Sequence, residues 1–145
     1  MFVQGCSGGG VLTAWVVGHD DRFAAAASLC PVTNWISMVG TTDISAWTFE
    51  WFDKQFWEDT KNWLDRSPIM RTGYIKTPTL FMTGVLDIRT PMAQTEEMYI
   101  ALKEAGVDTV LVRMNEEWHG TGRRKPTNWF RTYGYLSEWY EKYSK

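Results

Sequence analysis

Apolar residues in the second half of the chain fall into two short runs that are separated by an amphipathic stretch. The run from Thr77 to Gly84 ends at a glycine and predicts a buried strand, and the run from Val107 to Met114 predicts another. Between them, Pro91 suits the first turn of a helix and Gly106 suits its C-terminal cap. This half of the chain is therefore expected to form a strand, a helix and a second strand.

The two ends of the chain continue the alternation. Residues 1–5 predict the end of a strand, and residues 8–17 predict a helix. The apolar run 23–30 stops at Pro31 and predicts a strand buried on both faces, although its alanines are also compatible with a helix. A last helix is expected over residues 127–143. The repeated strand-helix order predicts an α/β fold with a mostly parallel sheet of about four strands and flanking helices.

The stretch from residue 43 to residue 64 is rich in aromatic side chains. Trp47 and Trp51 lie four positions apart, on one helical face, which predicts one or two amphipathic helices. Residues 33–40 are expected to form a loop, and Asp43 to cap the helix that follows. The aromatic residues have two interpretations: they pack in the core and between subunits, or they line a pocket for an acyl group.

Composition narrows the class of protein. The 145 residues are 44% hydrophobic and 22% charged, which is typical of one soluble globular domain. No apolar run approaches the roughly 18 residues of a membrane span, and a net charge of −2 does not favour nucleic-acid binding.

No secretory signal is recognisable, so we expect a cytoplasmic protein. We expect no cofactor and no metal, because Cys6 and Cys30 lack the spacing of metal ligands.

The chemistry is indicated by the sequence Gly5-Cys6-Ser7-Gly8-Gly9. The GxSxG pattern places a serine on a sharp strand-to-helix turn, with its hydroxyl exposed. Alone the pattern is weak, since small residues are common in structural turns.

Two residues farther along the chain strengthen the hydrolase hypothesis. Asp87 and His119 each follow a predicted strand, and the order Ser, Asp, His is the one that α/β hydrolases use. In such a triad the imidazole takes the serine proton and the carboxylate orients the imidazole. A histidine base with a pKa near 6.5 predicts activity that rises through about pH 6 to 8.

Several neighbours of these residues have plainer interpretations. Cys6 is expected to turn away from Ser7 and to behave as a small buried apolar side chain. Glu116 and Glu117 flank the histidine loop and are expected to face solvent. A cysteine hydrolase that uses Cys6 is a remote alternative, because Cys6 occupies the variable position of the motif.

The chain resembles the catalytic domain of the prolyl oligopeptidase family of serine peptidases, in particular its acylaminoacyl peptidase-like branch. The resemblance covers nearly the whole chain and rests on five segments: Gly5–Gly10, Arg66–Ile69, Lys76–Leu80, Gly84 with Asp87, and Glu117 with His119 and Gly120. It implies that Ser7 is the nucleophile, His119 the general base and Asp87 the residue that orients the base. The backbone amide of Gly8 is then one donor of the oxyanion hole.

The resemblance also implies that residues 1–145 are a single partial α/β-hydrolase domain, the C-terminal part. The N-terminal strands, the second oxyanion donor and the propeller that screens substrates by size would be missing. We therefore expect a weak, promiscuous serine hydrolase that acts on small esters more readily than on peptides. An open sheet edge and the aromatic segment are expected to join two copies in a homodimer. The alternative is an inactive fragment that functions, if at all, by assembly with another chain.

Overall fold

The computed structural model describes residues 1–144. Its four strands form one sheet in the order β1-β2-β3-β4, and every neighbouring pair is parallel. The strands are β1 (Phe2–Cys6), β2 (Ala25–Leu29), β3 (Thr79–Gly84) and β4 (Thr109–Met114). The helices are α1 (Gly8–Val16), α2 (Trp35–Thr41), α3 (Ser45–Phe49), α4 (Thr60–Asp65), the 3₁₀ helix η1 (Pro68–Tyr74), α5 (Met92–Glu104) and α6 (Pro126–Lys142). The predicted α/β class and parallel sheet are confirmed.

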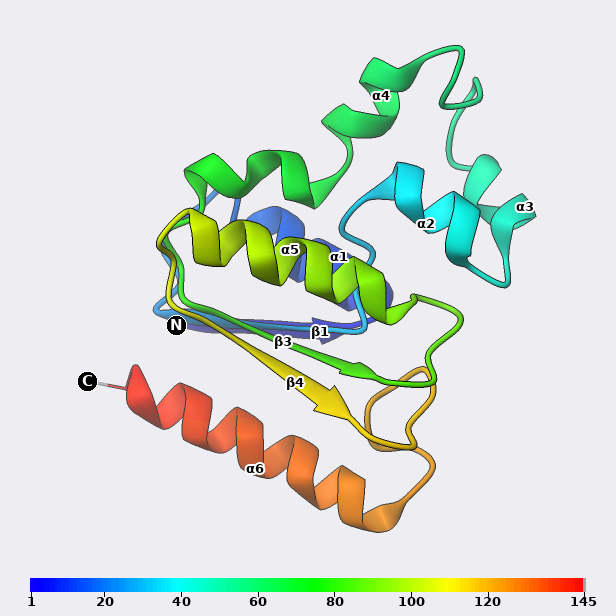
Figure 1. Ribbon diagram of the computed structural model, residues 1–145. Helices are drawn as coiled ribbons and strands as arrows, with labels where there is room; N and C mark the ends of the chain where they lie inside the picture. The colour runs from blue at the N-terminus through cyan, green and yellow to red at the C-terminus, as the bar shows by residue number, and fades with distance from the viewer. Residues whose placement is uncertain (145) are drawn as a thin grey trace.

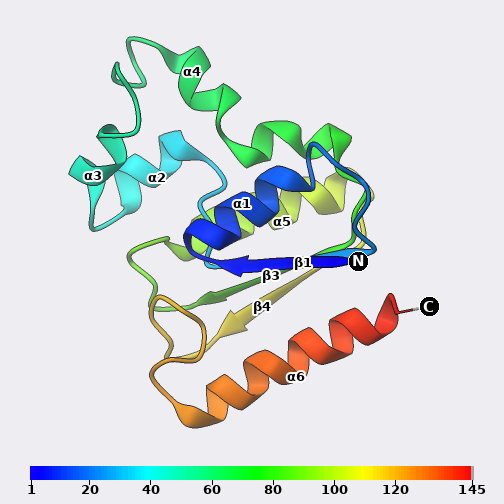
Figure 2. The same cartoon turned by 180° about the vertical axis from the view of Figure 1, so that it is seen from behind.

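Helices cover both faces of the sheet. Figure 1 and its reverse view in Figure 2 show α1 and α5 on one face and α6 on the other. Successive residues of a strand point to opposite faces of the sheet. Ala25 and Ala27 pack towards Trp139 of α6, whereas Ala26 packs in the cluster that contains Met98 of α5. Burial on both faces explains why the alanine run forms a strand with no polar alternation.

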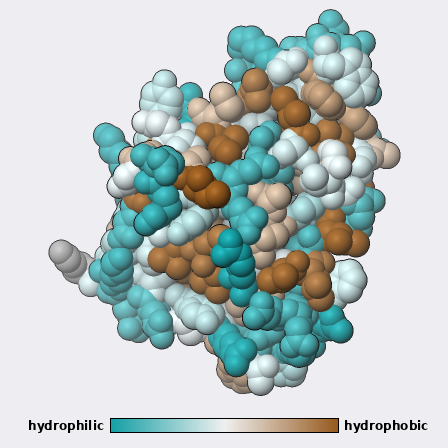
Figure 3. Space-filling model, viewed as in Figure 1, coloured by the Kyte–Doolittle hydropathy of each residue, from teal (hydrophilic) through white to brown (hydrophobic). Residues whose placement is uncertain are grey.

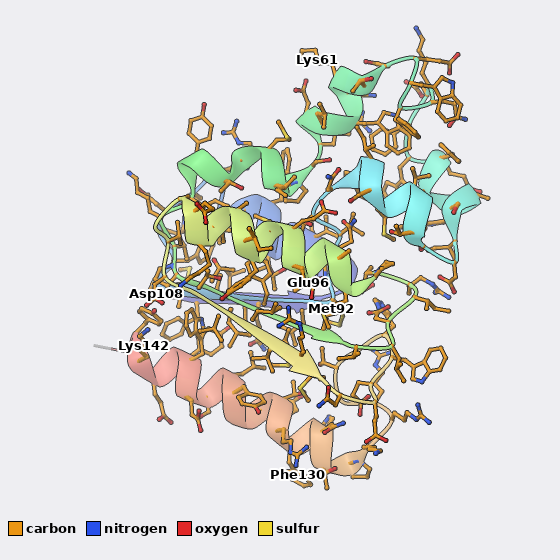
Figure 4. The ribbon with its side chains drawn as sticks, in the orientation of Figure 1. Lys61, Met92, Glu96, Asp108, Phe130 and Lys142 are labelled. Carbon is orange, nitrogen blue, oxygen red and sulfur yellow. A yellow bond between two sulfur atoms is a disulfide. The ribbon has the colours of Figure 1, made fainter. Side chains whose placement is uncertain are left out.

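Helix α6 is held to the sheet along its length. Its buried residues Asn128, Thr132, Leu136 and Trp139 recur every three or four positions, as in an amphipathic helix. At its C-terminal end, Lys142 Nζ lies 2.6 Å from Asp108 Oδ2 at the start of β4 (Figure 4). This contact fixes the end of α6 that lies farthest from the carboxyl ends of the strands.

The aromatic segment forms a small core of its own beside the sheet. Trp63 is fully buried and stacks on Phe52, with 3.8 Å between the ring centroids. The expectation of a loop over residues 33–40 was wrong, because helix α2 begins at Trp35. Asn34 accounts for this helix: its side chain accepts hydrogen bonds from the backbone amides of Ile36 and Ser37.

The surface at the edge strands differs from the covered faces of the sheet. Strand β4 forms one edge, and the space-filling view shows apolar surface between α5 and α6 on this side of the molecule (Figure 3). Val110 of β4 is 39% exposed.

None of the helices within residues 1–144 combines the length and the apolar character that a membrane crossing requires.

Candidate active site

Ser7 lies on a tight turn between β1 and α1. Its backbone has φ 60° and ψ −119°, a left-handed conformation that is unfavourable for a residue with a side chain. A Cβ on Gly5 would come within 2.4 Å of the backbone of Gly9, and one on Gly10 within 2.3 Å of the carbonyl oxygen of Leu29. Gly5 and Gly10 are therefore required by close backbone packing, which lets α1 begin directly after the serine.

The structure brings Ser7, His119 and Asp87 together. His119 Nε2 lies 2.8 Å from Ser7 Oγ, and His119 Nδ1 lies 2.8 Å from Asp87 Oδ2. All three residues follow the carboxyl ends of strands, as the sequence predicts. The distances allow one continuous hydrogen-bond chain from the hydroxyl through the imidazole to the carboxylate.

The carboxylate of Asp87 is fully buried and is held by its own loop. The backbone amides of Arg89 and Thr90 both donate to Oδ1 at 2.9 Å. Oδ2 is thereby left to face the imidazole. A buried carboxylate with three hydrogen-bond partners is a suitable group to fix the orientation of a histidine ring.

Thr90 is a fourth polar group at this point, which the sequence did not reveal. Its hydroxyl donates to the carbonyl oxygen of Cys30 at 2.9 Å. The same oxygen lies 3.1 Å from Asp87 Oδ2 and 3.2 Å from His119 Nδ1. Thr90 thus links the end of β2 to Asp87 and His119. The spacing Asp-x-x-Thr is the only signal in the sequence, and it also occurs in ordinary turns.

Glu117 fixes the loop that carries His119. The expectation that it faces solvent was wrong, because only 1% of it is exposed; Glu116 is exposed, as expected. The Glu117 carboxylate accepts hydrogen bonds from the backbone amides of Arg124 and Lys125, both at 3.0 Å, and from Asn128 at 2.9 Å. Burial alone would raise the pKa of Glu117, but these hydrogen bonds outweigh it and hold the pKa below 4.5. Glu117 is therefore an ionised anchor between the His119 loop and α6.

The loops of Asp87 and His119 also touch through their backbones. A Cβ on Gly84 would lie 2.2 Å from the carbonyl oxygen of Trp118 and 2.4 Å from that of Glu117. The backbone amide of Leu86 donates to the Glu117 carbonyl at 2.9 Å. Only glycine at the end of β3 allows this approach, which holds the Asp87 loop close to the His119 loop.

Cys6 and Cys30 form a disulfide, which corrects the expectation that Cys6 is a lone apolar side chain. The bond joins the ends of β1 and β2, one residue before Ser7. Cys30, Asp87 and His119 also place one potential ligand atom each within 4.8 Å of one another. Two of the three are already hydrogen-bonded to each other, and the sulfur of Cys30 is bonded to Cys6.

A cavity of about 790 Å³ opens at Ser7 and His119. Trp35, Trp47 and Trp51 form an aromatic wall, and aliphatic side chains such as Leu12 and Ile44 contribute to the rest of the lining. The structure thus divides the aromatic segment between the two interpretations, since Trp63 is buried in the core whereas Trp47 and Trp51 are 39% and 54% exposed.

Arg89 also lines the cavity, and its guanidinium pairs with Asp43. Asp43 is therefore not the expected helix cap. The residue in the capping position of α3 is Ile44.

Gly8 stands at the first position of α1 and lines the same cavity. The amides of a first helical turn have no acceptor within their own helix, so this N–H is available to a ligand. The positive end of the helix dipole also lies beside Ser7.

Comparison with known proteins assigns the family. A sequence model of the prolyl oligopeptidase family matches residues 1–145. The chain belongs to the prolyl oligopeptidase family. It is 36% identical over 143 residues to YuxL, an uncharacterized peptidase of Bacillus subtilis (strain 168), in a match that covers 97% of this chain and 22% of YuxL. It is 36% identical over 152 residues to the acylamino-acid-releasing enzyme of Arabidopsis thaliana, with 99% of this chain and 20% of the enzyme covered.

The fold of this family member agrees with a solved relative. An acylaminoacyl peptidase in complex with Z-Gly-Gly-Phe-chloromethyl ketone superposes with a TM-score of 0.89 and 25% sequence identity. The match covers 97% of this chain and 23% of that peptidase. The resemblance to the family and the α/β-hydrolase class, both predicted from sequence, are confirmed, and the chain spans between 20% and 23% of the length of these three relatives.

Proposed function

We propose that the chain is an acyl hydrolase in which Ser7 is the nucleophile, His119 the general acid and base, and Asp87 the group that orients the imidazole. The hydrogen-bond chain from Ser7 Oγ to Asp87, with both distances at 2.8 Å, carries this proposal. The three residues also lie on loops that follow strands, and Ser7 and His119 line a cavity, which further supports the proposal.

The reaction divides into two acyl transfers. Ser7 Oγ attacks the carbonyl carbon of the substrate while its proton passes to His119 Nε2. The bond to the leaving group then breaks, and the same proton passes from His119 to the departing oxygen or nitrogen. Water repeats the sequence on the acyl-enzyme and releases the acid.

The negative oxygen of the tetrahedral intermediate needs hydrogen-bond donors. We assign the backbone amide of Gly8 as one donor, because it begins α1 beside Ser7. With a single donor the rate is lower by about 100-fold to 1,000-fold than with a complete oxyanion hole. Activated esters depend less on this stabilisation than amides do, so small esters are the better substrates.

The aromatic wall favours an apolar acyl group. Trp35, Trp47 and Trp51 line the cavity that contains Ser7. The inhibitor in the related acylaminoacyl peptidase carries a Phe residue next to its chloromethyl ketone. By analogy, we propose an aromatic or large aliphatic residue on the acyl side of the scissile bond.

Covalent labelling tests the proposed function. The 145-residue protein is treated with a fluorophosphonate, and the site of the adduct is located by peptide mass spectrometry. We expect one adduct on Ser7, no labelling of Ser7→Ala, and strongly reduced labelling of His119→Gln. Ser137→Ala removes an exposed serine from α6 and should label like the unmodified protein. A folded protein that takes up no label is an inactive fragment. The disulfide with Cys30 leaves Cys6 without the free thiol that a cysteine hydrolase would need.

We also propose that two copies associate through β1. Within residues 1–144, β1 pairs only with β2, so its outer backbone groups are open to a second strand. Phe2 is exposed there beside a groove of about 520 Å³ that Tyr133 and Tyr140 also line. Light scattering should give twice the 16.8 kDa of one chain. Phe2→Lys should shift the mass towards the monomer. An unmodified protein that is monomeric at about 50 μM, within the μM–mM range in which exposed strand edges associate, contradicts the proposal.

A further inference from the structure

Two arginines line the cavity that contains Ser7, and they differ in their partners. Arg89 donates from Nε and Nη2 to both carboxylate oxygens of Asp43, at 2.7 and 3.0 Å. Arg123 makes no ion pair and no side-chain hydrogen bond with any residue of the described part of the chain, 1–144. The charge of Arg89 is thus compensated within the protein, whereas that of Arg123 is not.

Arg123 lies against the loop of the catalytic base. A Cβ on Gly120 would be 2.8 Å from both Cδ and Nε of Arg123, so the side chain lies directly over Gly120. Gly120 follows His119 and has φ 107°, which favours glycine in any case. The side chain of Arg123 therefore packs on the residue that follows His119, and both Arg123 and His119 line the cavity at Ser7.

Arg123 also stands where two cavities meet. A second cavity, of about 350 Å³, lies between the end of β1, the His119 loop and α6. The two cavities share Cys6 and Arg123, and no acidic residue of the described chain lines either of them. A ligand bound at Ser7 can thus extend past Arg123 into the second cavity without meeting a carboxylate.

The position of His119 identifies the part of the substrate that would meet Arg123. The general acid protonates the leaving group, so this group must lie on the His119 side of Ser7. The aromatic wall comes from the α2–α3 region, and Figure 1 shows this region and the β4–α6 loop on opposite sides of the carboxyl ends of the strands. The acyl group and the leaving group therefore extend in opposite directions.

We propose that Arg123 binds a carboxylate on the leaving group. The substrate class is then an ester or amide with an apolar acyl residue and a free carboxylate a few atoms beyond the scissile bond, such as an acylated amino acid or short peptide with a free C-terminus. A guanidinium presents paired donors that match the two oxygens of a carboxylate. This inference rests on the proposed function, because it takes Ser7 and His119 to define the direction of the substrate.

Two substrates that differ only in this charge test the proposal. N-acetylphenylalanyl glycolate has a leaving group with a carboxylate, and its glycolamide analogue is neutral. The kcat/KM of each is divided by its alkaline hydrolysis rate, which corrects for the different leaving groups. We expect the unmodified protein to prefer the glycolate about tenfold to 100-fold, as for a charge-assisted hydrogen bond.

Arg123→Gln should abolish this preference, and Arg124→Gln, which removes the neighbouring exposed cation outside both cavities, should keep it. Equal corrected rates in the unmodified protein, or a preference that survives Arg123→Gln, overturn the proposal while leaving the acyl hydrolase intact.

Binding gives a second readout that does not require turnover. Tryptophan fluorescence of Ser7→Ala is titrated with N-acetylphenylalanylglycine and with its carboxamide. The acid should bind about tenfold more tightly, and the double variant Ser7→Ala/Arg123→Gln should bind both equally. If the unmodified protein hydrolyses none of these substrates but Ser7→Ala still binds the acid more tightly than the carboxamide, the proposed function is overturned and the carboxylate site is supported. Equal Kd values in Ser7→Ala overturn the carboxylate site.

Discussion

The two walls of the cavity at Ser7 are built in different ways. On one wall, Ser7 and His119 sit on loops that follow strands of a single sheet, with Asp87 buried behind His119, and their spacing is set by backbone contacts at Gly5 and Gly84. On the other wall, tryptophans of the α2–α3 region pack on a separate aromatic core around Trp63. Changes in the first wall should therefore alter the chemical step, and changes in the second should alter substrate binding or local stability.

The largest effect is expected from Asp87→Asn. The amide keeps the shape of the side chain, but it removes the charge that stabilises the imidazolium and favours the wrong tautomer of His119. We expect kcat for a p-nitrophenyl ester to fall about 10,000-fold. Asp108→Asn removes a carboxylate at the opposite end of the sheet and should keep kcat within about twofold. Comparable losses in the two variants would show that Asp87 acts through stability alone.

Gly84→Ala should give the next largest effect. The new methyl group would overlap the carbonyl oxygens of Trp118 and Glu117 and push the His119 loop away from Asp87. A displacement of about 1 Å can cost about 100-fold in rate, which we expect for kcat.

Gly134→Ala is the matched control for this variant. Gly134 lies in α6 and has open space around its Cβ position, so the substitution should raise stability by about 0.5–1 kcal/mol without changing kcat. If Gly84→Ala retains full kcat, the backbone contact does not set the triad distance.

The second wall is tested by a pair of tryptophans. Trp63→Ala empties a fully buried site that stacks on Phe52, and it should destabilise the protein by about 3–5 kcal/mol in urea unfolding. Trp51→Ala removes a half-exposed wall residue and should raise KM about tenfold for an ester with an aromatic acyl group, with a smaller change in kcat. The opposite pattern, with stability lost at Trp51 and KM changed at Trp63, would reverse the assignment of core and wall.

The sequence predicted the first wall better than the second, for a physical reason. The GxSxG turn is a local constraint, since a Cβ on Gly5 would collide with the backbone of Gly9 in the same turn. Asp87 and His119 were found because loops after parallel strands meet at one edge of the sheet. Helix α2 was missed because its start depends on one capping side chain, Asn34, within a segment without clear periodicity.

Interactions between distant segments were the ones that the sequence could not reveal. The disulfide joins Cys6 to Cys30, but nothing in their spacing shows that β1 and β2 end side by side. Glu117 looked like a surface acid, because its three donors come from the start of α6. The role of Thr90 depends on the carbonyl of Cys30, 60 positions away in the chain. These contacts exist only once the sheet has formed.

The smallest expected effect is on the pH dependence of stability, and it tests Glu117, which holds the His119 loop but does not belong to the proposed triad. The pKa of Glu117 is lower in the folded protein than its usual 4.5, so its stabilising contribution is complete above about pH 4.5 and is lost as the pH falls through the folded value. Thermal melts between pH 7 and pH 3 should show Glu117→Gln less stable than the unmodified protein at pH 7 and losing less stability on acidification, so that the two curves converge. Glu116→Gln should follow the unmodified protein closely, because Glu116 is exposed and, within residues 1–144, its carboxylate pairs only with the half-exposed Lys125. Parallel curves for Glu117→Gln and the unmodified protein would mean that the carboxylate is not the ionised anchor, and the His119 loop would then be held by its backbone contacts with Gly84 and Leu86.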